Sequence, residues 1–358
     1  MDAPNVVVYR SDGSIGGTQP VSGFPIRPAG SISPSNWVTI AGRNYFLFDG
    51  NSAGYTVWSV GPDGSAVREP LGLFSTSSLY GPIVEFDSQP FFLQVNCTGS
   101  EYQWNVDTLS KEVHISAGNG VANLTPTGNR LLMLASEGNN PFQLYVYDPA
   151  VTSGPKVHPV LNNGGPGYTS QLGGLKTVGN LAAFTAYDPI NGHELWLTDG
   201  TANGTRVIDV DPDPDSSSPT LLASVGNTLV FTAYDGKKRM LYALTGGGTP
   251  EPLREVTSDP QLILAGDHLY GLVQSSEGTF FVSIADGGGI TNFRDADPAH
   301  AFTGPSQFTE AGGSVYYVDY LPAVSKKVVW KIVDSSHLVP VETQMDHVGQ
   351  IAGLNGVL

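Results

Sequence analysis

An all-β fold, an eight-bladed β-propeller made of four-stranded antiparallel blades, is predicted by three features of the sequence. A phrase of about ten residues recurs along the chain, short strand-like segments fill each repeat, and the two ends match complementary halves of one repeat. A seven-bladed propeller is the alternative. We expect residues 1–358 to form a single β-propeller domain.

The clearest copies of the repeated phrase are residues 179–188 and 226–235, which begin 47 residues apart. Each starts with Gly-Asn, continues as an apolar run and ends in Thr-Ala-Tyr-Asp. A small turn residue followed by an apolar run recurs at Gly42, Asp87, Gly128, Gly266, Gly312 and Gly353. The mean spacing of about 44 residues is that of one four-stranded propeller blade.

Four short strands are predicted within each repeat. Residues 221–225 and 228–234 match a first and a second strand, and residues 194–198 and 205–210 of the preceding repeat match a third and a fourth. Each segment is rich in β-branched or aromatic residues and is bounded by Gly, Pro, Asn or Asp. The chain contains 44 Gly and 26 Pro, and no segment keeps a 3.6-residue apolar period, so we expect almost no helix.

The third strand of the repeat carries a large aromatic residue ahead of a turn. Large aromatic side chains supply much of a β core, so we interpret these residues as packing residues between neighbouring sheets. They are Tyr9, Trp58, Trp104, Tyr145, Trp196, Tyr242 and Trp330, and Val282 occupies the same place in the remaining repeat.

The two ends of the chain predict how the repeats close. Residues 7–13 match the third strand of the repeat, and residues 348–358 match the first strand and the opening of the second. Two half-repeats and seven complete repeats make eight blades. Pairing of the two halves in one sheet removes the exposed sheet edges that promote aggregation.

Residues 194–205, Glu-Leu-Trp-Leu-Thr-Asp-Gly-Thr-Ala-Asn-Gly-Thr, resemble the ELWxxDGT repeat found mainly in large exported bacterial proteins. Residues 209–212 and 216–219 resemble that family's linker between units, and Asp12-Gly13-Ser14 is a weaker second match. The resemblance implies a β-propeller in a secreted, cell-surface or periplasmic bacterial setting, and it implies no general activity. We expect Asp199-Gly200-Thr201 to form a tight hairpin, with Gly200 at positive φ and Asp199 bonding nearby backbone amides.

Charge and composition exclude several kinds of partner. The net charge of −16 argues against nucleic acid and anionic membrane surfaces, because both require basic patches. We expect no membrane insertion, since no apolar run approaches the roughly 20 residues of a membrane span. The single cysteine, Cys97, excludes an internal disulfide framework and a Cys-based metal cluster.

Acidic residues concentrate in two kinds of loop that emerge on the same face of a propeller. These are the loops between second and third strands and the loops between consecutive blades, and such loops commonly carry function. His300 and His347 lie beside acidic residues of this kind, where they could take part in acid–base chemistry or transition-metal binding. The candidate ligand-binding residues are Asp188, Asp235, Asp297, His300, Asp346 and His347.

A calcium site is the one metal site suggested by spacing. Carboxylates at every second residue, Asp209, Asp211, Asp213 and Asp215, suit hard cations that prefer oxygen ligands. Prolines at positions 212 and 214 and the lack of a glycine in this loop fit a rigid solvated turn instead. We expect no other cofactor.

The leading functional hypothesis is a non-enzymatic recognition or adhesion module. It would bind an extracellular protein or glycan through the acidic loops, with calcium assisting, as a monomer or as part of a larger surface assembly. The Gly-x-Ser-x-Gly pattern at residues 50–54 precedes a predicted strand and so lacks the helix that a hydrolase nucleophile requires. The alternatives are a hydrolase or lyase that acts on an extracellular polymer at the central opening, with carboxylates from separate blades, and a structural segment of a larger adhesin.

Overall fold

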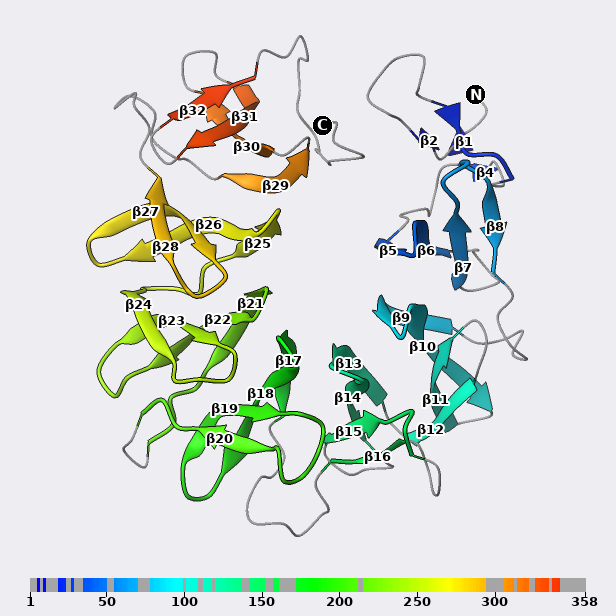
Figure 1. The fold of residues 1–358 in the computed structure, drawn as a ribbon, viewed down its shortest axis with the longest axis horizontal. Coiled ribbons are helices and arrows are strands. Elements are labelled where there is room, and N and C mark those ends of the chain that lie inside the picture. Colours follow the sequence, from blue (N-terminus) through cyan, green and yellow to red (C-terminus); the bar gives the residue numbers. More distant parts are fainter. Residues whose placement is uncertain are drawn as a thin grey trace. The chain divides into compact units, whose positions relative to one another are not determined.

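The fold is described from a computed structural model of the chain. It describes residues 5–6, 9–10, 19–23, 27–28, 35–49, 55–69, 78–98, 101–108, 112–117, 120–136, 142–151, 157–160, 172–211, 215–293, 305–311, 314–321, 326–334 and 337–341. Every regular element in these residues is a β-strand (Figure 1). Within them, no helix is long and apolar enough to cross a membrane.

The described residues group into two compact units. Unit 1 comprises Met1–Ser11, Ile15–Leu175 and Thr198–Thr205, and unit 2 comprises Asp12–Ser14, Lys176–Leu197 and Arg206–Leu358. The boundary passes within strand β19 (Gly192–Thr198), so each unit contains part of one sheet.

In unit 1, three four-stranded antiparallel sheets follow one another along the chain. Their strands are β5 (Ser35–Ile40), β6 (Arg43–Asp49), β7 (Tyr55–Val60) and β8 (Ala66–Arg68); β9 (Ser78–Phe86), β10 (Gln89–Thr98), β11 (Glu101–Thr108) and β12 (Glu112–Ala117); and β13 (Gly120–Thr127), β14 (Arg130–Ser136), β15 (Gln143–Tyr147) and β16 (Val157–Pro159). Before them lie two short pairs, β1 (Asn5–Val6) with β4 (Arg27–Pro28) and β2 (Tyr9–Arg10) with β3 (Gln19–Pro20).

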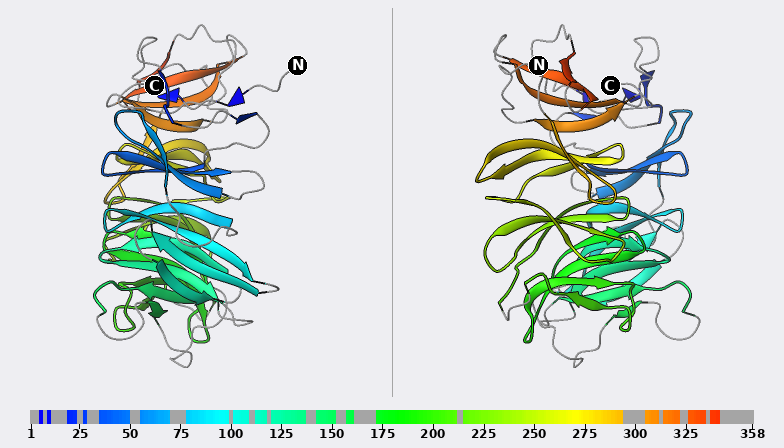
Figure 2. Two further views of the ribbon diagram at one scale, coloured as in Figure 1. Left: turned by 90° about the vertical axis from the view of Figure 1, so that its right-hand side faces the viewer. Right: turned by 60° about the vertical axis from the view of Figure 1, so that its left-hand side comes forward.

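The sheet divided at the unit boundary contains β17 (Gly173–Val178), β18 (Leu181–Asp188), β19 and β20 (Arg206–Ile208). Three further four-stranded sheets belong to unit 2. Their strands are β21 (Thr220–Val225), β22 (Thr228–Tyr234), β23 (Arg239–Thr245) and β24 (Glu251–Glu255); β25 (Leu262–Ala265), β26 (His268–Ser275), β27 (Gly278–Ala285) and β28 (Ile290–Phe293); and β29 (Ser306–Ala311), β30 (Ser314–Leu321), β31 (Lys326–Asp334) and β32 (His337–Pro340). Figure 2 shows the twist of the strands within individual sheets.

In each of these sheets the strands pair in the order in which they occur along the chain, so each sheet is an antiparallel meander. The chain is therefore an all-β β-propeller of four-stranded blades, as predicted. The described residues contain seven such sheets, and the predicted eighth blade is not confirmed. At the N-terminal end, Tyr9 pairs with Pro20 as expected for third and fourth strands, whereas residues 348–358 lie outside the described residues.

The predicted aromatic residues occupy the third strand in six of the seven four-stranded sheets. The side chains of Trp58, Tyr145, Trp196, Tyr242 and Trp330 are all less than a tenth exposed, which confirms that they pack in the core. Val282 lies on β27, also a third strand.

In several sheets a proline of the fourth strand pairs with the aromatic residue of the third strand, a feature that we did not predict. The pairs are Tyr9 with Pro20, Tyr145 with Pro159, Tyr242 with Pro252, and Trp330 with Pro340.

The hydrophobic core lies between consecutive sheets of each unit. In unit 2, Phe184 stacks on Trp196 with ring centroids 6.1 Å apart, and Phe231 stacks on Tyr242 at 5.3 Å. Leu195 and Phe231 share one buried cluster, although they belong to successive sheets. Because each blade alone leaves an apolar face uncovered, packing of neighbouring blades stabilises both.

Candidate functional site

The predicted ligand residue Asp188 lies at the end of β18 and is only 4% exposed. Its Oδ1 atom accepts hydrogen bonds from the backbone N–H groups of Ile190 at 2.7 Å and Asn191 at 3.0 Å, and Oδ2 accepts one from Asn191 Nδ2 at 2.6 Å. Burial acts to raise the pKa of Asp188, but these hydrogen bonds outweigh it and hold the pKa below its ordinary value. Asp188 is therefore an ionised residue that fixes the turn between β18 and β19.

Asp235 fixes the equivalent turn of the next blade, between β22 and β23. Its Oδ1 atom accepts hydrogen bonds from the backbone N–H groups of Lys238 at 2.8 Å and Lys237 at 3.0 Å. The Lys238 hydrogen bond is the largest cause that lowers the pKa of Asp235. The carboxylate of Asp235 is exposed, unlike that of Asp188. Both residues thus have a defined turn role, and ligand binding by them stays a prediction.

Asp209 and Asp211 lie in the connection between β20 and β21, close to the same turns. Desolvation and the negative charges of Asp211 and Asp188 raise the pKa of Asp209. Asp211 is 4% exposed and lies against the β22–β23 turn, because a Cβ atom at Gly236 would stand 3.0 Å from Asp211 Oδ1. We call Asp188, Asp209, Asp211 and Asp235 the acidic loop cluster; it lies within unit 2.

The fully buried carboxylate of Glu194, on β19, anchors the same connection. Its Oε1 and Oε2 atoms accept hydrogen bonds from the backbone N–H and the hydroxyl of Ser217, and Oε2 accepts one from the backbone N–H of Val210 at 3.3 Å. Burial raises the pKa of Glu194, although these hydrogen bonds oppose the rise. The first residue of the ELWxxDGT segment therefore holds the loop that carries Asp209 and Asp211.

Arg239 makes a second polar network at the start of β23. Its Nε donates to Asp259 Oδ1 at 2.7 Å, and its Nη2 donates to the hydroxyls of Thr220 and Thr232, each at 2.8 Å. Burial acts to raise the pKa of Asp259, but the bonds from Arg239 and Thr232 hold it below its ordinary value. The guanidinium carbon of Arg239 also lies 5.3 Å from the centre of the Tyr234 ring. Arg239 thus connects the loop after β24 to β21 and β22.

The structure describes three of the four alternating carboxylates predicted to bind calcium. Asp209 and Asp211 lie close enough to influence each other, Asp215 is exposed, and Asp213 lies outside the described residues. Within the described part of the chain, no three acidic, histidine or cysteine side chains converge closely enough to hold a metal ion. Calcium binding stays a prediction.

The other predicted ligand residues, Asp297, His300, Asp346 and His347, lie outside the described residues.

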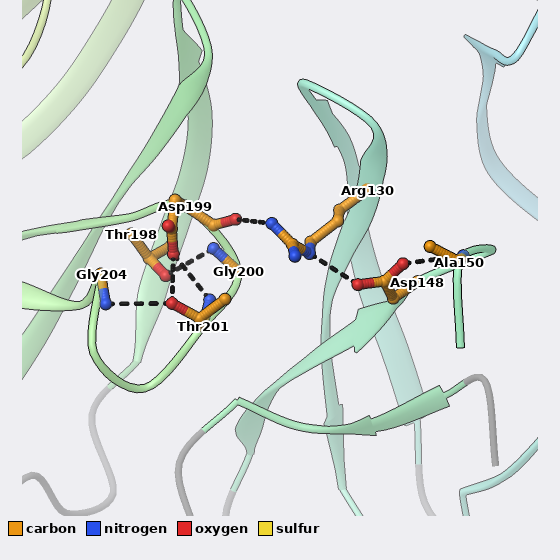
Figure 3. Close-up of polar contacts among 8 residues, drawn as sticks. All are labelled: Arg130, Asp148, Ala150, Thr198, Asp199, Gly200, Thr201 and Gly204. Carbon is orange, nitrogen blue, oxygen red and sulfur yellow. Dashed lines mark hydrogen bonds and ion pairs between the residues drawn. The ribbon is translucent and has the colours of Figure 1, made fainter. Parts of the chain in front are cut away.

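The Asp-Gly-Thr segment forms the hairpin between β19 and β20 that the resemblance led us to expect (Figure 3). Asp199 Oδ1 accepts hydrogen bonds from the backbone N–H of Thr201 at 2.8 Å and from its hydroxyl at 2.7 Å. Gly200 has a φ of 89°, and the Thr201 hydroxyl accepts a bond from the Gly204 backbone N–H at 3.0 Å. These polar groups therefore stabilise the hairpin itself.

Arg130 links this hairpin to the preceding sheet within unit 1, and sequence reasoning did not identify it. Figure 3 shows the guanidinium between two loops: Nε pairs with Asp148 Oδ2 at 2.9 Å, and Nη1 donates to the backbone carbonyl of Asp199 at 3.1 Å. Only the position of Arg130 directly after the Gly128 turn could have pointed to it.

A second hairpin of the same kind was also missed. Asp63, between β7 and β8, accepts hydrogen bonds from the backbone N–H of Ser65 at 3.0 Å and from its hydroxyl at 2.7 Å. The Asp-Gly-Ser sequence was a usable signal, but it follows Trp58 by five residues, whereas Asp199 follows Trp196 by three. The weaker match at Asp12-Gly13-Ser14 lies outside the described residues.

The chain is similar to several solved structures. No family model and no curated protein matches the sequence. Among solved structures, one from a study of two prolyl endopeptidases is 15% identical with a TM-score of 0.48, over 86% of this chain and 48% of that one. A streptogramin B lyase is 14% identical with a TM-score of 0.39, over 80% of this chain and 92% of that one. The β-propeller domain of the Trilobed protease from Pyrococcus furiosus is 12% identical with a TM-score of 0.44, over 88% of this chain and all of that domain.

The chain spans about half the length of the prolyl endopeptidase that it matches. At these identities the similarity concerns the fold, and it carries no information about activity.

Proposed function

We propose that the chain is a recognition or adhesion module of a secreted or cell-surface bacterial protein. It binds an extracellular protein or glycan through the acidic loop cluster. The observation that carries this proposal is the gathering of Asp188, Asp209, Asp211 and Asp235 from three loops of unit 2, the β18–β19 turn, the β20–β21 connection and the β22–β23 turn. The hydrogen bonds that fix Asp188 and Asp235 also lower their pKa values, so both are ionised at neutral pH.

Fixed, ionised carboxylates suit recognition better than proton transfer. A general acid or base works best with a pKa near the working pH, whereas hydrogen bonds from their own turns lower the pKa values of Asp188 and Asp235. Rigid turns also limit the side-chain entropy that is lost on binding. The exposed carboxylates of Asp209 and Asp235, with the buried charges of Asp188 and Asp211 close by, favour partners with positive charges or with many hydroxyl groups.

A glycan array tests this proposal. Purified wild-type protein is compared with the double variant Asp209→Asn/Asp211→Asn and with the control Asp267→Asn, which removes one charge from an exposed turn between β25 and β26. We expect a defined set of glycans to bind the wild type and the control but not the double variant. Equal binding by all three proteins would place recognition outside the acidic loop cluster.

Calcium assists binding in this proposal. The charges of Asp188 and Asp211 already disfavour ionisation of Asp209, and a divalent cation would relieve this repulsion. We expect calcium to raise the melting temperature of the wild type, a chelator to reverse the rise, and Asp209→Asn/Asp211→Asn to abolish it. A melting temperature that is unaffected by calcium in the wild type would remove calcium from the proposal.

A hydrolase or lyase acting on an extracellular polymer is the second candidate function. The observation that favours it is the raised pKa of Asp209 beside Asp211, since an acid next to a second carboxylate is a common catalytic arrangement. Chromatography of polysaccharides and peptides incubated with the protein tests this candidate. Product that forms with the wild type and disappears with Asp209→Asn would support it, and lack of product from either protein would exclude the substrates tested.

A further inference from the structure

Prolines lie on the outermost strand of several blades. Pro159 in β16, Pro252 in β24 and Pro340 in β32 each pair with the aromatic residue of the neighbouring third strand. The fourth strand is the last in each sheet, so one of its two sides has no neighbouring strand within the sheet. An edge of this kind presents free backbone N–H and C=O groups with which a strand of another molecule can pair.

The hydrogen bonds beside two of these prolines show which way the proline nitrogens face. The backbone N–H of Val341, the residue after Pro340, donates to the carbonyl of Val329 at 2.8 Å. The backbone N–H of Val160, the residue after Pro159, makes the same kind of bond to the third strand, also at 2.8 Å. Successive residues of an antiparallel strand face the partner strand and the opposite side in turn, so the nitrogens of Pro159 and Pro340 face the outer edge. Each proline therefore removes a donor from that edge at no cost to its own sheet.

The outer strand β8 shows what happens at an edge without proline. Arg68 takes the register position of the prolines there. The backbone N–H of Ala66 donates to the carbonyl of Ser22 at 2.7 Å, and the N–H of Ser22 donates to the carbonyl of Gly64 at 3.1 Å. Ser22 thus pairs in parallel with Ser65, outside the four-stranded sheet. The outer edge of this blade accepts a further segment of the chain.

We propose that Pro159 and Pro340 prevent the outer edges of their blades from pairing with the same edges of a second copy of the chain. Two copies that meet edge to edge are related by a twofold axis, and the two strands then run antiparallel. At such a contact each proline faces the partner strand without a donor. The exposed position of Pro340 agrees with this role, because nothing in the described part of its own blade covers it.

Sedimentation velocity of the full chain over a wide range of protein concentrations tests the proposal. The variant Pro340→Thr restores the outward N–H group. The matched control is Val339→Thr, since Val339 pairs with Lys331 and lies two residues before Val341, so its N–H faces the sheet. We expect Pro340→Thr to lower the dissociation constant of a dimer at least about tenfold relative to the wild type, and Val339→Thr to change it less than about twofold.

Circular dichroism of each protein separates edge pairing from unfolding. We expect Pro340→Thr to keep a cooperative melting profile and its dimers to dissociate on dilution. If Pro340→Thr does not fold, Pro159→Thr with the control His158→Thr repeats the test in β16, where His158 lies two residues before Val160.

Two results would overturn the inference. The first is a folded proline variant whose mass stays equal to that of the wild type at every concentration. The second is equal association of the proline variant and its control, since this would assign the effect to the threonine side chain. Val207 in β20 and Asn292 in β28 take the position of the prolines in every protein compared, so association through those edges does not affect the comparison.

Discussion

At the scale of single residues, the polar groups of the ELWxxDGT segment are used to build the fold. Asp199 and Thr201 hold their own hairpin, and Glu194 holds a loop 23 residues further along the chain through Ser217. The sequence predicted the role of Asp199 because its partners are only two residues away. The role of Glu194 could not be predicted, since it depends on where the next blade begins.

The hydrogen bonds that Asp199 accepts in the hairpin predict that two substitutions at this position destabilise the chain to different extents. Asp199→Ala removes the acceptor for both bonds from Thr201 and should lower the free energy of unfolding by about 1–2 kcal/mol. Asp199→Asn keeps one oxygen acceptor and should lower it less. Urea denaturation measures both values, and an equal loss in the two variants would show that these hydrogen bonds do not stabilise the hairpin.

The lowered pKa of Asp188 predicts a pH-dependent contribution to stability. Its carboxylate is more acidic in the folded chain than the ordinary value of 3.8, so the unfolded chain binds the proton more tightly. The stabilisation is complete above that ordinary value and is lost as the pH falls through the folded pKa. Asp188→Asn should lower the free energy of unfolding by only about 1 kcal/mol at neutral pH, because Asn keeps one acceptor oxygen.

The difference in the free energy of unfolding between Asp188→Asn and the wild type should shrink as the pH falls below about 4. Protonation of Asp188 then removes the charge that distinguishes the wild type from the variant. Urea midpoints measured across this pH range give the comparison. A difference that stays constant with pH would contradict the assignment of a lowered pKa to Asp188.

At the scale of elements, strand order and the packing of aromatic residues were predictable. Both follow from a local pattern of apolar and turn residues that repeats in every blade, so Trp58, Trp196 and Trp330 were placed correctly on third strands. The acidic loop cluster was predictable only in part. The equivalence of Asp188 and Asp235 came from the repeat, but the approach of Asp211 to Gly236 depends on how one loop folds over the next.

The contact between the β19–β20 hairpin and Arg130 could not be predicted from the sequence either. The residues are 69 positions apart, and no local pattern links them. Arg130 is 25% exposed and Asp148 is 13% exposed, so their ion pair is partly shielded from solvent. Such pairs are more strongly coupled than exposed ones, because water screens them less.

A double-mutant cycle with Arg130→Met and Asp148→Asn tests this shielding. We expect a coupling energy of about 1 kcal/mol from urea unfolding of the wild type, both single variants and the double variant. The control is the same cycle on Lys238 and Glu255, whose side chains are 57% and 31% exposed, and whose coupling should be much smaller. Coupling of the control pair as strong as that of Arg130 and Asp148 would refute the role of burial.

At the scale of the whole molecule, the single domain stays a prediction of the sequence, and the described residues group into two compact units. The boundary between the units passes within β19: Thr198 belongs to unit 1 and the rest of the strand to unit 2. Because the residues of this one sheet are divided between the two units, we expect a single cooperative transition.

Differential scanning calorimetry tests that prediction. We expect one heat-absorption peak with a ratio of calorimetric to van't Hoff enthalpy of about 1, as for a two-state domain. Asp199→Ala in unit 1 and Asp188→Asn in unit 2 should each move the whole peak to lower temperature without splitting it. Two peaks, of which each variant shifts only one, would show that the units unfold independently and that the prediction of a single domain is wrong.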